Sequence, residues 1–152
     1  MIEVKNLTKL YGTHVAVDDI SFEVHEGEIL GFLGPNGAGK STTMNILTGY
    51  LSATEGTVKI DGIDILENPD EAKKLIGFLP EQPPLYVDMT VNEYLNFVYE
   101  IKGCKLNRAK HLEEVRQVTK IDDVQNRLIK NLSKGYRQRV GIAQALVGNP
   151  PV

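Results

Sequence analysis

One short stretch of the sequence, residues 34–41, combines the residue types that bind phosphate. It reads Gly-Pro-Asn-Gly-Ala-Gly-Lys-Ser, which has the spacing of a phosphate-binding loop. Glycines let a backbone turn sharply and approach a ligand closely, because they carry no Cβ. The N–H groups of such a loop converge on one anion, and the helix expected after it adds unpaired N–H groups and a positive dipole end. The stretch therefore predicts a site for a nucleoside triphosphate and its Mg²⁺.

The residues of this loop have separate expected roles. Lys40 is expected to reach the β- and γ-phosphates and to act in catalysis, Ser41 to bind Mg²⁺ through its hydroxyl, and Thr42 to donate to the α-phosphate region. Further nucleotide contacts are expected from Gly34, Pro35, Asn36, Gly37, Ala38 and Gly39. Kinases, GTPases and transport ATPases share this pattern, so it indicates the ligand class but not the reaction.

The elements around the loop must hold it in place. The apolar run Ile29–Leu33 predicts a strand that ends at the loop, and the pattern of Thr42–Tyr50 predicts a helix after it. In that helical pattern Met44, Leu47 and Leu51 are expected to face the core.

Strands predominate in the rest of the N-terminal half. They are expected over Ile2–Leu10, Val15–Val17, Ile20–Val24, Thr57–Ile60 and Leu75–Leu79. Glu55-Gly56 and Asp61-Gly62 are expected as turns, with a hairpin at the second, and Asn68-Pro69 opens a short helix through Lys74.

Helical patterns replace the strands after Pro80. Thr90 and Glu93 have the spacing of a capping box, and Ser133 is placed to cap a helix that runs to about Val147. The apolar positions expected to face the core of this part are Val91, Tyr94, Leu95 and Val98, then Leu112, Val115 and Val118 in a helix that starts at Asn107. We expect a strand-rich nucleotide-binding lobe over 1–82 and a helical lobe over 83–148.

Composition narrows the class of protein. The 152 residues carry a net charge of −3, which gives no electrostatic reason to expect a nucleic-acid partner. The single cysteine, Cys104, excludes an internal disulfide. No apolar run is long enough to span a membrane, and the N-terminus does not have the pattern of a signal peptide, so a cytoplasmic location is expected.

Three further stretches stand, together with the loop, in the order in which one protein family carries its motifs. They are Leu10-Tyr11-Gly12 before it, Gly77-Phe78-Leu79-Pro80-Glu81-Gln82 after it, and Leu132-Ser133-Lys134-Gly135-Tyr136-Arg137-Gln138-Arg139 further on. Together they resemble the A-loop, Walker A, Q-loop and signature motif of the ATP-binding subunit of an ABC transporter, and the wording of the last resembles the bacterial exporters. The resemblance implies an α/β P-loop NTPase fold with an antiparallel β subdomain and an α-helical subdomain.

The resemblance also implies residue roles. Tyr11 is expected to stack on adenine, with Ala16 as a second apolar contact, and Gln82 to reach Mg²⁺ or the attacking water and so act in catalysis. Ser133 and Gly135 are expected to face the γ-phosphate bound to a second copy, so that two ATP molecules lie between two chains in a head-to-tail dimer.

A transmembrane permease is the other implied partner, and it would hold the protein at the inner face of the cell membrane. The segment Pro83–Thr90 and the helix after it are expected to receive this permease. The signature stretch departs from the family, since Lys134 replaces the usual first glycine and Tyr136 the usual glutamine.

The family's Walker B strand, with its Asp-Glu pair, has no counterpart up to Val152. We therefore expect the C-terminal catalytic part to be absent, the central sheet to be incomplete, and the chain alone to turn over ATP negligibly. In the complete protein, hydrolysis of ATP to ADP and phosphate is expected to power transport. A nucleotide-binding fragment without turnover and a soluble ABC ATPase without a transport partner remain alternatives. A GTPase is disfavoured, since no Asn-Lys-x-Asp is present, and a P-loop kinase fits the stretch around Ser133 less well.

Overall fold

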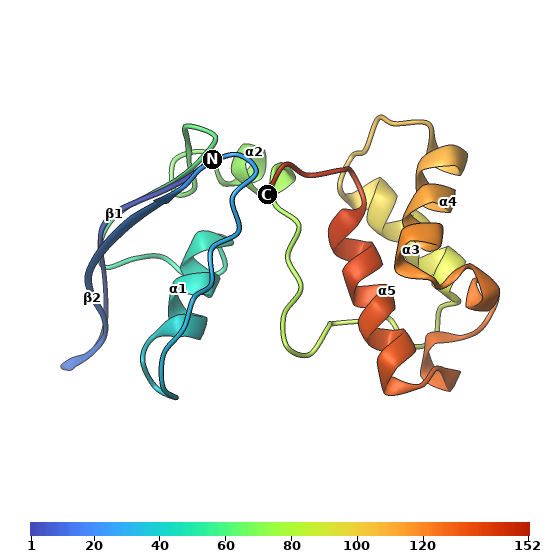
Figure 1. Cartoon of the computed structure of the whole chain (residues 1–152), viewed down its shortest axis with the longest axis horizontal. Helices are drawn as coiled ribbons and strands as arrows, with labels where there is room; N and C mark the ends of the chain where they lie inside the picture. The colour runs from blue at the N-terminus through green and yellow to red at the C-terminus, as the bar shows by residue number, and fades with distance from the viewer. The chain divides into compact units, whose positions relative to one another are not determined.

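A computed structural model describes all residues from Met1 to Val152. The chain forms two compact units, one of Met1–Ile76 together with Val152, and one of Gly77–Pro151. Figure 1 shows the strands and α1 in the first unit and α3, α4 and α5 in the second.

The first unit is built on an antiparallel sheet in the order β2-β1-β3-β4. Its strands are β1 (Ile2–Tyr11), β2 (His14–Val24), β3 (Glu55–Ile60) and β4 (Ile63–Asp64). The predicted strand over Ile2–Leu10 is confirmed, whereas the two short strands expected between residues 15 and 24 are one continuous strand. Asp19 within this strand adopts a left-handed φ of 42°, as Asn6 of β1 does at 48°. The Asn6 amide donates to the Asp19 carboxylate at 2.9 Å, and the pairing of β1 with β2 continues past register irregularities in this region.

The hairpin between β3 and β4 is confirmed. Asp61 and Gly62 both have positive φ, 48° and 80°, as a two-residue hairpin turn requires. Glu55 and Gly56 belong to β3 and are not the expected turn. A Cβ on Gly56 would lie 2.3 Å from the carbonyl oxygen of Asn6, so a glycine lets β3 come close to β1 there.

Two predicted strands are wrong. Ile29–Leu33 has no regular structure, and the side chains of Ile29 and Leu33 are 96% and 93% exposed. The sheet holds no neighbour for this segment, and an apolar run becomes a strand only where another strand satisfies its N–H and C=O groups. Leu75–Leu79 is irregular as well, because the N–H groups of Leu75 and Ile76 bond back to Ala72 and Lys73 at the end of a helix.

Two helices complete the first unit, α1 (Lys40–Leu47) and α2 (Pro69–Lys74). The second has the expected bounds, with Pro69 in its first turn. Met44 was wrongly placed in the core, since it is 40% exposed. Leu47 is buried as expected, and Ile46 is buried in place of Met44. Both pack with residues of the sheet, namely Val4, Leu7, Val17, Val58 and Ile60. Leu47 was common to both possible faces of the helix, so spacing alone did not choose between Met44 and Ile46.

The second unit contains α3 (Val91–Ile101), α4 (Arg108–Thr119) and α5 (Lys134–Leu146). Two short 3-10 helices, η1 (Asp122–Val124) and η2 (Ile129–Asn131), connect α4 to α5. The capping box of α3 is confirmed, because the Thr90 hydroxyl accepts from the Glu93 N–H and the Glu93 carboxylate accepts from the Thr90 N–H. Asn107 and Ser133 cap α4 and α5 as expected.

The core of this unit lies between the three helices. Its fully buried members include Val91, Leu95, Ile121, Ile129 and Val140. Val118 was wrongly expected in this core and is 73% exposed. The buried face of α4 contains Leu112, Val115 and Thr119, and Val118 lies outside it. Across the chain, no helix is both long and apolar enough to cross a membrane.

Candidate nucleotide site

The loop before α1 takes the backbone conformation that its glycines permit. Gly37 and Gly39 adopt left-handed φ values of 84° and 83°, which cost a residue with a Cβ about 1–2 kcal/mol. Between them the Ala38 N–H bonds to the Pro35 carbonyl oxygen at 3.2 Å. The chain therefore makes a tight turn and enters the helix directly at Lys40.

Gly39 also permits a close approach between the loop and β2. A Cβ at this position would lie 2.3 Å from the carbonyl oxygen of Ala16 and 3.1 Å from a methyl of Val17. By contrast, a Cβ at Gly37 would meet nothing within 4 Å. Of the two glycines, Gly39 is thus required for packing as well as for its φ.

The N-terminus of α1 is the one long helix start without a capping side chain. Side chains of Thr90, Asn107 and Ser133 cap α3, α4 and α5, whereas Gly39 at the N-cap of α1 offers none. The first helical bond runs from the Thr43 N–H to the Gly39 carbonyl oxygen, at 2.8 Å. The earlier N–H groups of α1 therefore have no helical acceptor, which suits an anion at this position.

Lys40 folds its side chain back over the loop. Its ammonium donates to the carbonyl oxygens of Gly34 and Pro35, both at 2.7 Å, and forms no ion pair with a carboxylate. Ser41, which is exposed, and Thr42, which is half-buried, follow in the first turn. A positive charge without a counter-charge therefore stands beside the open helix start.

A hollow of about 370 Å³ opens between this loop and β2. Its lining consists of Val15, Ala16, Val17, Asp18, Ile20, Phe32, Leu33, Gly37, Ala38, Lys40 and Thr43. The structure thus brings together Ala16, two loop residues and the lysine, all of which the sequence had indicated. Tyr11 is absent from this lining and stands 49% exposed at the end of β1, with the Lys9 ammonium 5.4 Å from its ring centre.

The remaining predicted site residues, Gln82, Ser133 and Gly135, belong to the second unit. Within it, Gln82 lines a second hollow, of about 470 Å³. The rest of this lining is Glu81, Pro83, Leu85, Val87, Lys134, Arg137 and Gln138. Gln82 and the first turn of α5 therefore face one space, with two cations from that turn. Ser133 is exposed, and its Oγ accepts from the Tyr136 N–H at 3.3 Å.

Sequence reasoning missed some residues at these two places. Thr43 and Asp18 line the first hollow, and Thr43 is buried with its hydroxyl bonded to the Gly39 carbonyl oxygen at 3.0 Å. Arg137 lines the second. The helical spacing of Thr43 from Gly39 was a usable signal, whereas nothing local to Asp18 indicated that β2 passes the loop.

Comparisons with known proteins agree on one family. The family model described as ABC transporter matches residues 17–152. The uncharacterized ABC transporter ATP-binding protein YxlF of Bacillus subtilis (strain 168) is 38% identical over 151 residues, 99% of this chain and 50% of that protein. The bacitracin transport ATP-binding protein BcrA of Bacillus licheniformis is 35% identical over 150 residues, 99% and 48% of the two.

A solved structure is similar over nearly the whole chain. It is the ATP-binding cassette MJ0796 in a dimeric, post-hydrolysis state bound to ADP and Pi, at 32% identity and a TM-score of 0.85, over 99% of this chain and 71% of that one. The chain spans about half the length of the two curated relatives above. The expected α/β P-loop fold with a partial sheet is thereby confirmed.

Proposed function

Because this chain belongs to the ABC transporter family of ATP-binding proteins, we propose that it binds Mg-ATP at the loop before α1. We further propose that a protein of the length of these relatives that contains this chain, called the longer protein below, hydrolyses ATP to ADP and phosphate. We propose that this hydrolysis powers transport through a membrane permease. The observation that carries the proposal is the uncapped start of α1 beside the ammonium of Lys40, which bonds to two carbonyl oxygens but to no carboxylate.

The residues of this chain account for binding and orientation of the nucleotide. Gly37 and Gly39 give the loop its tight turn into α1, and the open N–H groups at the start of α1 are the donors we propose for the phosphates. Lys40 has only two carbonyl oxygens to leave when a phosphate arrives, so its charge is available to the β- and γ-phosphates. For the base we propose two contacts, stacking on the ring of Tyr11 and apolar packing on Ala16.

The proposed Mg²⁺ ligands are the hydroxyl of Ser41 and the amide oxygen of Gln82. Oxygen ligands of this kind, completed by phosphates and water, suit Mg²⁺. When bound, the ion supplies neutralisation of the charge on the phosphates during transfer. Ser41 is exposed in the first turn of α1, as such a ligand must be.

Partners follow from the same proposal. MJ0796 is dimeric in its solved structure, and we propose a second copy as partner here, with Ser133 and Gly135 of each chain facing the γ-phosphate held by the other. A permease that docks on Pro83–Thr90 would place the protein at the inner face of the membrane. The exposed Tyr86 and Val87 in that segment, 55% and 41% exposed, support such a contact.

For the 152-residue chain by itself, we propose nucleotide binding without measurable turnover. Asp18 is the sole carboxylate in the lining of the first hollow, and it is exposed. A general base has to be held within hydrogen-bond reach of the attacking water, and the lining offers no other carboxylate for this.

Steady-state hydrolysis in the longer protein tests the proposal. Wild type should release phosphate, Lys40→Ala should lose this activity, and the exposed Lys74→Ala in the same unit should keep it. The 152-residue chain should give no rate above background. A longer protein that releases no phosphate, or an active Lys40→Ala variant, would contradict the proposal.

A further inference from the structure

The first turn of α5 is attached to η1 by one side chain, that of Tyr136. Its hydroxyl donates to the Asp123 carboxylate, with 2.8 Å between Oη and Oδ2. The Arg139 guanidinium lies 5.2 Å from the centre of the same ring, and the ring packs against the core of the second unit. At its own N–H, Tyr136 bonds to the Oγ of Ser133. One residue therefore contacts both the cap of α5 and a separate element.

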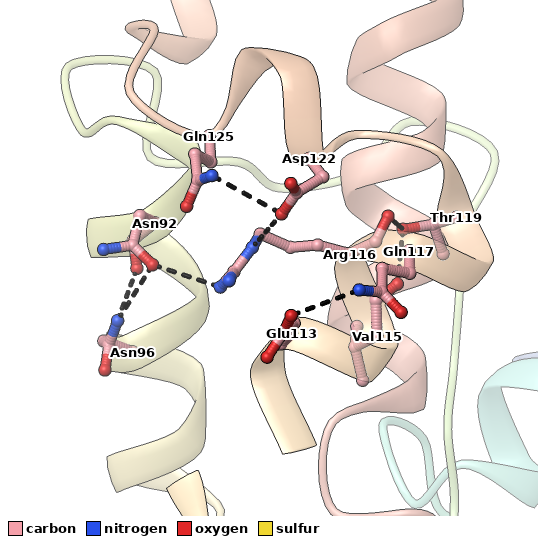
Figure 2. Close-up of polar contacts among 9 residues, drawn as sticks. All are labelled: Asn92, Asn96, Glu113, Val115, Arg116, Gln117, Thr119, Asp122 and Gln125. Atoms are coloured by element: carbon pink, nitrogen blue, oxygen red, sulfur yellow. Dashed lines mark hydrogen bonds and ion pairs between the residues drawn. The ribbon is translucent and has the colours of Figure 1, made fainter. Parts of the chain in front are cut away.

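The element that receives this bond is itself held from the other side. Figure 2 shows Arg116 of α4 reaching the neighbour of Asp123, Asp122, with 2.9 Å between Nε and Oδ1. The same guanidinium donates to the Asn92 side chain at 3.3 Å, and the Gln125 amide donates to Asp122 at 3.4 Å. The Arg116 side chain is 12% exposed. Through its contacts with Asp122 and Asn92 it connects η1 to both α3 and α4.

The sequence explains why α5 needs an anchor. In a capping box, the residue three positions after the cap is Glu or Gln and bonds back to the N–H of the cap residue, as Glu93 does for Thr90. In α5 that position is Tyr136, which has no such reach, and the position before it is Gly135, a weak helix former. The Ser133 side chain therefore has a single bond, of 3.3 Å, to its first turn.

We propose that Tyr136 is a positioning residue: its bond to Asp123 takes the place of the reciprocal capping bond and fixes Ser133 and Gly135 where they face phosphate. This inference rests on the proposed function of those two residues. The hydrogen bond to Asp123, with the charge of that carboxylate, raises the pKa of Tyr136. The hydroxyl is therefore protonated and donating at neutral pH.

Substitutions at both ends of the bond test the role in the longer protein. Tyr136→Phe keeps the ring beside Arg139 and removes only the donor, and Asp123→Ala removes the acceptor. Each should lower kcat about three- to tenfold, as expected for one hydrogen bond, with KM for ATP unchanged. The double variant should be no slower than either single variant, because both remove the same bond.

A third variant separates positioning from direct contact. Tyr136→Gln restores a capping box with Ser133, so it should keep a kcat near that of wild type. In the Y136Q background, Asp123→Ala should then leave kcat unchanged. Tyr94→Phe is the matched control, because it removes another tyrosine bond in the same unit, to Gln144, and should leave kcat unchanged.

Amide hydrogen exchange on the 152-residue chain tests the same role without turnover. Tyr136→Phe should speed exchange at the main-chain N–H of position 136, which bonds to the Oγ of Ser133, and Tyr94→Phe should not. An unchanged exchange rate there, an unchanged kcat, a rise in KM instead of a fall in kcat, or multiplicative effects in the double variant would each overturn the proposal. If the longer protein proves inactive, the proposed function fails, and exchange alone decides whether Tyr136 anchors α5.

Discussion

Alanine substitutions at Gly37 and Gly39 should separate the two reasons for a glycine in the loop before α1. Both residues have nearly the same φ, 84° and 83°, so each substitution incurs about 1–2 kcal/mol for a left-handed backbone. At Gly37 nothing more is added, since the new Cβ meets open space. Gly37→Ala should therefore destabilise the first unit by about 1–2 kcal/mol.

Gly39→Ala should be worse by the cost of a steric clash. Its Cβ would stand 2.3 Å from the main-chain oxygen of Ala16, and a backbone atom of β2 moves less easily than the end of a side chain. Forcing an extra carbon into packed structure adds about 1–3 kcal/mol. The total for this variant is about 2–5 kcal/mol.

Thermal melting of the 152-residue chain without nucleotide is the assay, so that loss of ligand contacts does not enter the comparison. In a unit as small as Met1–Ile76, each kcal/mol lowers Tm by about 4–8 °C. Gly39→Ala should melt well below Gly37→Ala. Equal Tm values for the two variants would refute the inference that the loop packs directly on the backbone of β2.

Three predictions concern the second unit. Burial, with a smaller effect from Tyr86, raises the pKa of Tyr94 to about 12. The contribution of the protonated Tyr94 hydroxyl to the free energy of unfolding is therefore complete below the unfolded pKa near 10, and it is lost as the pH rises to about 12. The unfolding free energy of wild type should fall by up to about 2.7 kcal/mol more than that of Tyr94→Phe across this window, and parallel curves would contradict it. Thr90→Ala removes the capping box of α3 and should cost about 1 kcal/mol in urea unfolding, whereas no change would mean that the cap is dispensable. The Lys102 ammonium donates to three carbonyl oxygens at the C-terminal end of α5, those of Gln144, Ala145 and the C-cap residue Val147, at 2.8–3.2 Å. Lys102→Met should therefore destabilise the unit by about 1–3 kcal/mol. The exposed Lys105→Met is its control and should unfold like wild type.

Features set by neighbouring residues in the sequence were predictable. The turn at Asp61-Gly62, the capping box at Thr90 and the cap at Ser133 each depend on residue types within four positions. The sharp turn of the loop before α1 belongs with them, because Gly37 and Gly39 are the residue type that adopts a positive φ readily.

Features that depend on a distant partner were not predictable. The apolar run at Ile29–Leu33 has the composition of a strand, but strand formation requires another strand beside it. Met44 and Ile46 are both apolar, and only the packing of α1 on the sheet selects Ile46. In the candidate site, the contact of Gly39 with Ala16 joins residues of separate elements and leaves no pattern in the sequence.

Calorimetric titration of the purified 152-residue chain with Mg-ATP, alongside Lys40→Ala, tests the central claim most directly. Saturable one-site binding to the wild-type chain, lost in Lys40→Ala, is the predicted result. Melting with nucleotide at about 100 times its Kd should then show about 2.7 kcal/mol of added stability. A wild-type chain that melts cooperatively but binds no Mg-ATP would contradict the claim that the loop before α1 is a nucleotide site.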